Sequence, residues 1–352
     1  MKKMTRKHFL KTLFCYTASG VSLMGMSRFT PRAEAQTAPA ASPSYSPPYL
    51  KLHSSGKLKE RAERLWHVMK RCSLCPRVCG TDRLAGYQGD CHSSGTLEIS
   101  DFHPHMGEEK SLVGRSGSGT VYFTNCNLRC VFCLNWQANM EGKGQETSPK
   151  SLAAVMLHLQ KKGCININLV TPTHYLPHIL KALDLAAAGG LHIPLVYNTS
   201  GWELVDTLKE LDGIIDVYLP DYKYSSSEMA AKYSAGNASY PQITQKALLE
   251  MQRQVGKAKP NAEGIINRGL MIRHLVMPNN VSGTKQVLAW IGANLPKDTY
   301  VNLLSQYRPF YKAVDYPEIN RRITKEEFNQ AIQWTQDAGL TNVQVQKYFD
   351  MI

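Results

Sequence analysis

The stretch from residue 119 to residue 339 alternates between strand-like and helix-like patterns, and this alternation restricts the fold more than any other feature of the chain. Short apolar or alternating runs predict strands at 120–124, 164–170, 193–198, 214–220, 269–278 and 299–307. Amphipathic runs predict helices at 148–163, 175–190, 202–213, 239–256, 283–295 and 324–339. Strands that alternate with helices form a parallel sheet, and units wound in one sense make a barrel or part of one. We therefore predict an α/β fold, a partial (β/α)6 TIM-like barrel.

A polar cluster accompanies the C-terminal end of each predicted strand. In chain order these clusters are Cys126 with Cys130 and Cys133, "TPTHY" (171–175), "YNTSGW" (197–202), "PDYKY" (220–224), "RHLVMP" (273–278) and "QYRPFY" (306–311). In barrels of this kind the ligand-binding groups lie on the loops at the C-terminal ends of the strands. Polar residues on helix faces would be a solvated surface, so their repetition at strand ends predicts a site.

Three cysteines lie in the loop after the first strand, with the spacing Cys-x3-Cys-x2-Cys (Cys126, Cys130, Cys133). Structural zinc takes four protein ligands, and catalytic zinc takes three that usually include nitrogen or carboxylate groups. Disulfides would leave one cysteine over. A cubane iron–sulfur cluster takes four ligands, so three thiolates leave one iron open to a substrate. The aromatic Phe132 precedes the last cysteine.

This motif, its place after the first strand and the βα periodicity resemble the radical S-adenosylmethionine (radical SAM) superfamily. Within the superfamily, residues 70 to 340 are most similar to the pyruvate formate-lyase activating enzyme and its uncharacterised relatives. Many of those relatives carry the stretches found here as "CSLCPRVCG" with a later Gly-x-Cys, "NINLVTPTHY", "VYNTSG", "YLPDYKY", "RHLV" and "QYRP".

The resemblance implies a [4Fe-4S] cluster on Cys126, Cys130 and Cys133, with S-adenosyl-L-methionine on the fourth iron. Reductive cleavage then yields methionine and a 5′-deoxyadenosyl radical that abstracts a hydrogen atom, while the protein supplies placement and shelter from water. An activating-enzyme-like oxidoreductase would take that hydrogen from a protein or peptide, for example from a glycine, and would need an electron donor. The alternatives are radical modification of a small metabolite and an exported two-cluster electron-transfer protein.

The same resemblance implies the residues that bind the cofactor, and it names no catalytic side chain. They are Phe132, Thr171, Thr173, Asn198, Thr199, Asp221, Lys223 and Arg273. Asp221 and Lys223 match an Asp-x-Lys pair of the activating enzymes, whereas Asn198 stands where those enzymes have an aspartate of a cation site. The superfamily's Gly-Gly-Glu is replaced by 171–174, which ends in His174. That imidazole would either position substrate and move a proton, or simply hydrogen-bond a neighbouring loop.

Four further cysteines, Cys72, Cys75, Cys79 and Cys91, lie in a short polar segment rich in turn residues. Such a segment is too small to build its own core and needs a bound metal or disulfides to stabilise it. The close spacing of the first three favours a metal, either zinc or a second iron–sulfur cluster. Disulfides are the alternative if the protein is exported to an oxidising compartment.

The N-terminus has the pattern of an export signal. A basic start, a moderately apolar stretch and Ala-Glu-Ala before Gln36 predict a signal peptide at 1–35, and residues 5–11 resemble a twin-arginine motif with Lys7 at the second arginine. This predicts a periplasmic or otherwise exported protein, or a cytoplasmic one if the leader does not function. A linker is expected at 36–56, the cysteine module at 57–110 and the barrel at 111–352.

The distribution of charged and apolar residues argues against a nucleic-acid-binding protein and against a membrane-spanning one. Residues 1–35 hold seven basic residues and one acidic residue, so they account for about half of the net charge of +13. The remaining charge is spread without a basic block, which argues against a nucleic-acid partner. Beyond the leader no stretch has eighteen uninterrupted apolar residues, so no transmembrane span is expected in the mature chain.

Overall fold

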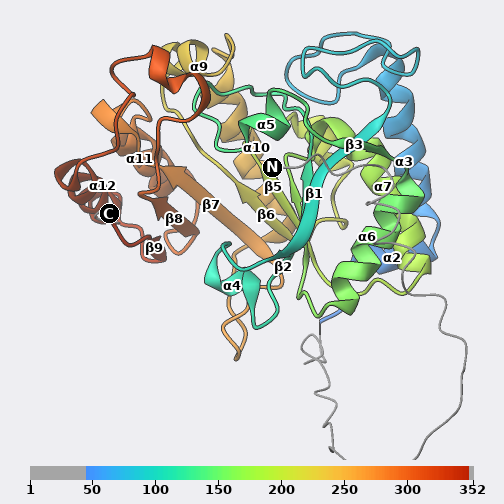
Figure 1. Cartoon of the computed structure of the whole chain (residues 1–352). Coiled ribbons are helices and arrows are strands. Elements are labelled where there is room, and N and C mark those ends of the chain that lie inside the picture. The colour runs from blue at the N-terminus through green and yellow to red at the C-terminus, as the bar shows by residue number, and fades with distance from the viewer. Residues whose placement is uncertain (1–44, 349–352) are drawn as a thin grey trace, which may run out of the picture. The chain divides into compact units, whose positions relative to one another are not determined.

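The computed structural model describes residues 45–348, which contain one sheet of nine strands (Figure 1). The strands are β1 (Leu97–His105), β2 (Ser118–Phe123), β3 (Gln145–Thr147), β4 (Ile167–Val170), β5 (Leu195–Thr199), β6 (Val217–Pro220), β7 (Gly269–Leu275), β8 (Tyr300–Leu304) and β9 (Val343–Val345). Their order is β3-β1-β2-β4-β5-β6-β7-β8-β9. From β2 through β9 every pairing is parallel, whereas β1 is antiparallel to both β2 and β3.

The long helices lie outside this sheet, and those from residue 149 onward connect its parallel strands. Those of the described chain are α2 (Tyr49–Ser54), α3 (Lys57–Val68), α4 (Lys110–Val113), α5 (Trp136–Asn139), α6 (Pro149–Lys161), α7 (Leu176–Ala188), α8 (Val205–Lys209), α9 (Ser227–Tyr233), α10 (Tyr240–Val255), α11 (Thr284–Asn294) and α12 (Lys325–Asp337). In Figure 1, α6 and α7 cover one side of the barrel and α11 and α12 the other. Helix α3 packs on α7 and so forms a second layer there. No helix within residues 45–348 is long and apolar enough to cross a membrane.

The six strands predicted from the sequence are β2, β4, β5, β6, β7 and β8, and the partial barrel is confirmed. The sequence did not predict β1, β3 and β9. Strand β1 contains Pro104, and its burial does not alternate regularly, because the exposed positions Asp101 and Pro104 are three residues apart. It therefore lacks the sequence pattern of a strand. The strands β3 and β9 have three residues each, which is too short for a period to register. They extend the two edges of the sheet.

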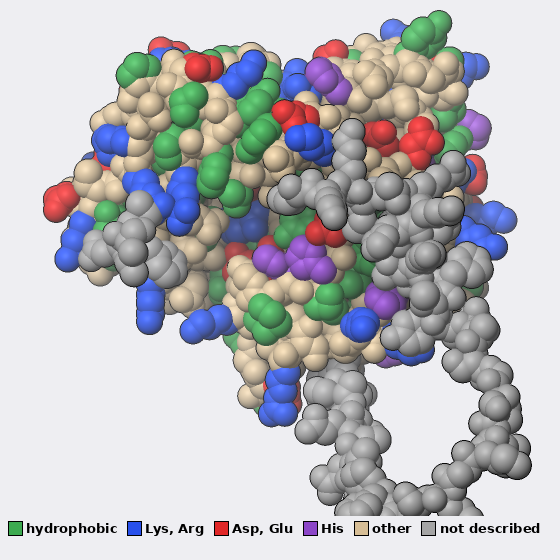
Figure 2. Space-filling model, in the orientation of Figure 1, with side chains coloured by type: hydrophobic (Ala, Val, Ile, Leu, Met, Phe, Trp, Pro, Cys, Tyr) green, Lys and Arg blue, Asp and Glu red, His purple; other side chains and the backbone are tan. Residues whose placement is uncertain are grey.

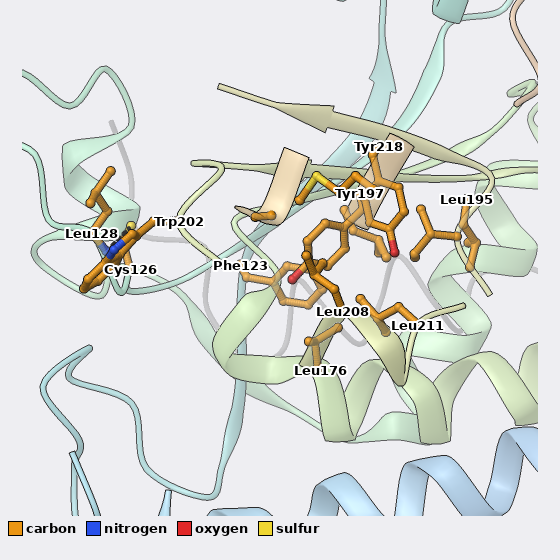
Figure 3. Packing of buried hydrophobic residues seen from close by; sticks show 14 of the residues in the cluster. Phe123, Cys126, Leu128, Leu176, Leu195, Tyr197, Trp202, Leu208, Leu211 and Tyr218 are labelled. Atoms are coloured by element: carbon orange, nitrogen blue, oxygen red, sulfur yellow. Dashed lines mark hydrogen bonds between the residues drawn. The ribbon is translucent and has the colours of Figure 1, made fainter. Parts of the chain in front are cut away.

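Alternation along the strands separates two apolar cores. Leu169, Tyr197 and Ile272 belong to the large outer core between sheet and helices. Figure 3 shows part of that core, where Leu195, Tyr197 and Tyr218 meet Leu208 and Leu211. The intervening residues face inward. A smaller cluster, formed by Leu112, Val196, Val217, Leu219, Ala258, Ile266, Met271 and Tyr300, fills the bottom of the barrel. Because Leu112 lies on α4, between β1 and β2, that connection closes the barrel at its N-terminal end.

Two expected boundaries differ from the structure. The linker predicted at 36–56 contains helix α2, whose Tyr49 is buried and donates a hydrogen bond to the Ile193 carbonyl at 3.0 Å. The module predicted at 57–110 contains β1, which pairs with β2 inside the barrel sheet. The described parts of both segments therefore belong to the same compact unit as the barrel. The predicted signal peptide and the first part of the linker lie outside the described residues.

Candidate functional site

The loop that carries Cys126, Cys130 and Cys133 leaves the C-terminal end of β2, as the sequence predicts. Two residues of this loop, Asn125 and Arg129, have φ of 64° and 60°. Left-handed backbone at these points lets the chain fold back on itself, so that all three thiols lie close to one another. In Figure 3, Cys126 lies beside Leu128 and Trp202, at one end of the buried cluster drawn there.

Each of the three thiols receives at least one hydrogen bond from the protein. The Leu128 backbone N–H donates to Cys126 Sγ at 3.4 Å. The Ser234 hydroxyl donates to Cys130 Sγ at 3.1 Å, and the Asn139 amide donates to Cys133 Sγ at 3.3 Å. Such donors favour a sulfur that carries negative charge, which is the form that ligates a metal.

Burial dominates the electrostatics of these cysteines. It raises the pKa of Cys130 to about 11 and that of Cys133 to about 12, although the Lys223 charge partly opposes the shift at Cys130. A buried thiolate therefore needs a compensating cation. Three thiols with sulfur-directed donors and no fourth protein thiol in the same loop suit an iron–sulfur cluster with one open iron.

A network of charged side chains spans the ends of β5, β6 and β7. Asp221 Oδ2 accepts from Lys223 Nζ at 2.5 Å, and Asp221 Oδ1 accepts from Arg273 Nε at 2.8 Å. The same guanidinium donates to Asn198 Oδ1 at 2.5 Å. Burial alone would raise the pKa of Asp221, but the two cations outweigh it and the pKa is lowered. The structure thus brings together four of the residues expected at the cofactor.

A buried carboxylate, Glu203, joins the loops after β4 and β5. It accepts hydrogen bonds from Thr173 at 2.7 Å and from the Thr199 and Tyr197 hydroxyls. Burial raises the pKa of Glu203 to about 7. The Thr173 and Thr199 side chains are therefore engaged within the protein, and only their backbone groups remain for a ligand. Sequence reasoning missed Glu203, because no motif marks it.

A glycine turn presses the loop after β5 against Asp221. Gly201 has φ of 78°, and a Cβ built there would lie 2.3 Å from the Asp221 carbonyl oxygen. The Tyr240 hydroxyl accepts from the Lys223 N–H at 2.8 Å, and it lies 2.8 Å from the Ser200 and Asp221 carbonyl oxygens. Only glycine fits this position, so the turn holds the charged network in place.

Three residues singled out from the sequence have partners within the protein. His174 is buried, and its Nε2–H donates to the Thr124 carbonyl at 2.8 Å. Burial lowers its pKa to about 3, so the ring is neutral and the interpretation as a loop-to-loop hydrogen bond holds. Phe132 packs against Tyr307 and Tyr224, with ring centres 5.7 and 6.3 Å away. Thr171, with φ of 59°, donates its backbone N–H to the Asn198 carbonyl at 2.9 Å.

The four N-terminal cysteines are unpaired by disulfides, and Cys72, Cys75 and Cys91 are buried. A Cβ on Gly89 would lie 3.0 Å from Cys79 Sγ and 3.8 Å from Cys91 Sγ, so these two sulfurs face one another across a glycine. Across residues 45–348 no three His, Cys, Asp or Glu side chains converge on a position for a single metal ion. This holds at Cys126, Cys130 and Cys133 as well.

A fully buried arginine attaches this module to the barrel. Arg83 donates to the Ser94 carbonyl at 2.8 and 3.0 Å and to the His174 carbonyl at 2.7 Å, and its Nη1 lies 3.9 Å from Cys72 Sγ. No carboxylate pairs with it in the described chain. A second arginine, Arg77, donates to the Asn127 carbonyl in the Cys126 loop at 2.6 Å. The two cysteine groups are therefore neighbours.

Comparison with known proteins agrees with this geometry. A family model described as "Radical SAM superfamily" matches residues 120–249. The chain is also 31% identical over 284 residues to "Uncharacterized protein MJ0674" of Methanocaldococcus jannaschii, a match that covers 78% of this chain and 77% of that protein. The chain belongs to the radical SAM superfamily. A radical SAM enzyme binds a [4Fe-4S] cluster and S-adenosylmethionine, and the three thiols at the end of β2, two of them buried and Cys133 half-buried, fit such a cluster.

Proposed function

We propose that this radical SAM enzyme abstracts a hydrogen atom from a protein or peptide partner, with a glycine of that partner as the activating-enzyme-like target. The observation that carries the proposal is the network of Asp221, Lys223, Arg273 and Asn198 beside the Cys126 loop. Its Asp-x-Lys pair matches the pyruvate formate-lyase activating enzymes, and Lys223 lies close enough to Cys130 to affect that thiol's pKa.

The residues of the site would bind the cluster and S-adenosylmethionine and exclude water from the reaction. Cys126, Cys130 and Cys133 would hold the cluster, and the charged network would receive the amino-acid end of S-adenosylmethionine. When bound, the two groups would supply the one-electron chemistry that makes S-adenosylmethionine a hydrogen-abstracting reagent. The side chains themselves orient the cofactor and keep water from the radical.

A cavity next to the loop of Cys126, Cys130 and Cys133 supports a large partner. A cavity of about 300 Å³ is lined by Leu134, directly after Cys133, and by Arg308, Phe310 and Tyr348 among others. Leu134 is 63% exposed, which is unusual for a leucine beside a buried metal loop. An exposed apolar residue with aromatic neighbours suits contact with another chain rather than enclosure of a small metabolite.

The decisive test is anaerobic reconstitution of the enzyme with iron and sulfide, followed by dithionite and S-adenosylmethionine. We expect 5′-deoxyadenosine and methionine in equal amounts, with deuterium in the nucleoside when a deuterated partner is added. Absence of 5′-deoxyadenosine from a protein with four bound irons would refute the enzyme assignment and favour an exported electron carrier. Deuterium transfer from a small metabolite alone would favour the second alternative.

We also propose that Cys72, Cys75, Cys79 and Cys91 hold a metal centre, either zinc or a second iron–sulfur cluster. Support comes from Arg83, a buried cation without a carboxylate partner whose Nη1 lies 3.9 Å from Cys72 Sγ. Metal-bound thiolates would supply the missing negative charge. About eight irons per protein would indicate two clusters, and about four irons with one zinc would indicate a structural ion. About four irons alone, with no free thiols at these cysteines, would indicate disulfides.

We propose further that a twin-arginine-like leader exports the folded protein with its cofactor. The support is the sequence pattern around Arg6 and the Ala-Glu-Ala site. The variant Arg6→Lys should then accumulate in the cytoplasm with its leader attached, as followed by fractionation and immunoblotting. Export that continues in a strain without the twin-arginine translocase would rule out this route.

A further inference from the structure

The inner face of the barrel carries a polar layer above its apolar floor. Asn168 on β4, Arg273 on β7 and Asn302 on β8 alternate along their strands with residues of the outer core, so they face inward. Glu108 and Glu109 reach the same layer from the connection between β1 and α4. We refer to these five residues as the lumen cluster.

Solvent reaches this layer although it lies deep in the barrel. The Arg273 and Glu108 side chains remain 17% and 11% exposed. Figure 2 shows a recess in this face of the molecule, with basic and acidic side chains in it. Part of the lumen cluster, at Arg273 and Glu108, is therefore within reach of solvent.

The polar atoms of the lumen cluster have more acceptors than donors. Glu109 Oε1 accepts from Asn302 Nδ2 at 2.9 Å, but Glu109 Oε2, Glu108 Oε2 and the Asn302 and Asn168 amide oxygens have no hydrogen-bond partner. The donors left over in the same cluster are Asn168 Nδ2, which has no partner, and Arg273 Nη1, which lies 3.8 Å from Glu108 Oε2. Asn168 itself is 0% exposed. Buried polar atoms of this kind need a ligand or ordered water.

The charged side chains in the lumen also leave an excess of negative charge. Asp221, in the layer above, is already paired with both Lys223 and Arg273. Arg273 Nη1 lies 3.8 Å from Glu108 Oε2, beyond hydrogen-bond distance. Burial raises the pKa of Glu108 to about 7; the Arg273 charge opposes this, and the adjacent Glu109 carboxylate adds to it. Glu108 therefore holds a proton more readily than an ordinary carboxyl group, and a further cation nearby would oppose this shift as Arg273 does.

We infer that the lumen cluster binds a guanidinium or ammonium group of the substrate, held by Glu108 and Glu109 and by the Asn168 and Asn302 amide oxygens. Such a group carries positive charge and several N–H donors, which complements four free acceptors and an excess carboxylate. The inference rests on the proposed function, because it assumes that the substrate enters the barrel below S-adenosylmethionine. The group comes either from an arginine or lysine side chain of a peptide or from a small basic metabolite.

The test uses the reconstituted holoenzyme and measures binding by saturation-transfer NMR. The probes are n-butylguanidine, n-butylamine and butyrate, and the variants are Glu108→Gln and Glu109→Gln. The matched control is Glu250→Gln. Like Glu109, Glu250 is 9% exposed and accepts a hydrogen bond from a side-chain amide, that of Gln254 at 2.8 Å, but it lies on α10 outside the barrel. We expect the guanidine or the amine to bind the wild type, and its dissociation constant to rise at least tenfold in both variants and to stay unchanged in the control.

A second measurement separates substrate from cofactor. The affinity for S-adenosylmethionine, measured by calorimetry, should change less than twofold in both variants. Guanidine binding that is unaffected by both substitutions, or equal binding of butyrate, would overturn the inference, and so would a tenfold loss of S-adenosylmethionine affinity. Circular dichroism shows whether each variant is folded. If one of Glu108→Gln and Glu109→Gln is misfolded, the result of the other tests the inference.

The source of the cation is distinguished with N-acetyl-Gly-Arg-Gly amide. Tighter binding of this peptide than of n-butylguanidine assigns the group to a peptide, and the reverse order assigns it to a small metabolite; failure of both to bind overturns the inference. Formation of 5′-deoxyadenosine by the wild type is scored separately. It tests the proposed function without any probe, so the two hypotheses fail independently.

Discussion

The two groups of cysteines are neighbours, yet their surroundings differ. Cys126, Cys130 and Cys133 follow a barrel strand, and the barrel supplies each sulfur with a donor and supplies Lys223 as a nearby cation. The four cysteines from Cys72 to Cys91 lie in turns, and their main electrostatic neighbour is the buried Arg83. Three ligands on a rigid strand end leave a metal open for chemistry, whereas four ligands close it. The difference fits a reactive centre in the first group, and the metal centre that we propose for the second group would be structural or an electron relay.

The largest expected effect separates cluster thiols from an ordinary buried thiol. Cys130→Ala should abolish 5′-deoxyadenosine formation, because one iron loses its protein ligand. Cys164→Ala is the matched control: Cys164 is 3% exposed at the start of the segment that leads into β4, and its loss should leave turnover unchanged. High-performance liquid chromatography of the nucleoside measures both. Normal turnover in Cys130→Ala would refute the cluster assignment.

The second prediction concerns variants that remove ligands from the N-terminal cysteine group and leave the first group intact. Cys72→Ser with Cys75→Ser should remove any metal beyond the first cluster while the characteristic absorption of that cluster remains. Metal analysis of anaerobically purified protein measures the change. Identical metal content in wild type and variant would show that these cysteines hold none.

The third prediction concerns the cation beside the first group. Lys223→Ala should retain the cluster and weaken S-adenosylmethionine binding by roughly tenfold or more, since a charge-assisted hydrogen bond is worth about 1.5–3 kcal/mol. Calorimetry gives the dissociation constant. The control is Lys181→Ala, whose ammonium pairs with Glu63 on the outer helices. An unchanged constant in Lys223→Ala would remove Lys223 from the site.

The fourth prediction concerns the cation of the second group. Arg83→Met leaves the Ser94 and His174 carbonyls without their donor, and each unsatisfied buried group costs about 1–3 kcal/mol. We expect the unfolding free energy of the metal-loaded protein to fall by about 3 kcal/mol, as followed by denaturant titration. A gain in stability would mean that Arg83 is a buried cation without an anionic partner, and would argue against metal-bound thiolates there.

The smallest effect tests the donors at the first group. Ser234→Ala removes the hydroxyl that donates to Cys130 Sγ and should lower the cluster's midpoint potential by ~40 mV, because such a bond favours the reduced, more negative form by about 1 kcal/mol. Ser118→Ala is the control, since that buried hydroxyl donates to Asn166 at 2.6 Å and not to a sulfur. An electrochemical titration that finds equal shifts would show that the Ser234 bond does not act on the cluster.

Local patterns were enough to predict the barrel and the place of its site. The alternation of strands and helices determined the six parallel strands, because period and chain order are properties of short segments. The spacing of Cys126, Cys130 and Cys133 after the first strand indicated a cluster for the same reason. The Asp221 and Lys223 pair also depends on two residues of one loop.

Only the tertiary structure decided which distant side chains meet. Glu203 closes the loops of two strands, Arg83 reaches 91 positions along the chain to the His174 carbonyl, and Glu109 meets Asn302 across 193 positions. The same contacts settled His174, which the sequence left between a titrating group and a loop tether. Periodicity describes neighbours along the chain, whereas burial and pairing depend on how separate elements pack. The sequence thus determined the scaffold and the metal loop, and the packing of the barrel decided the charge inside it.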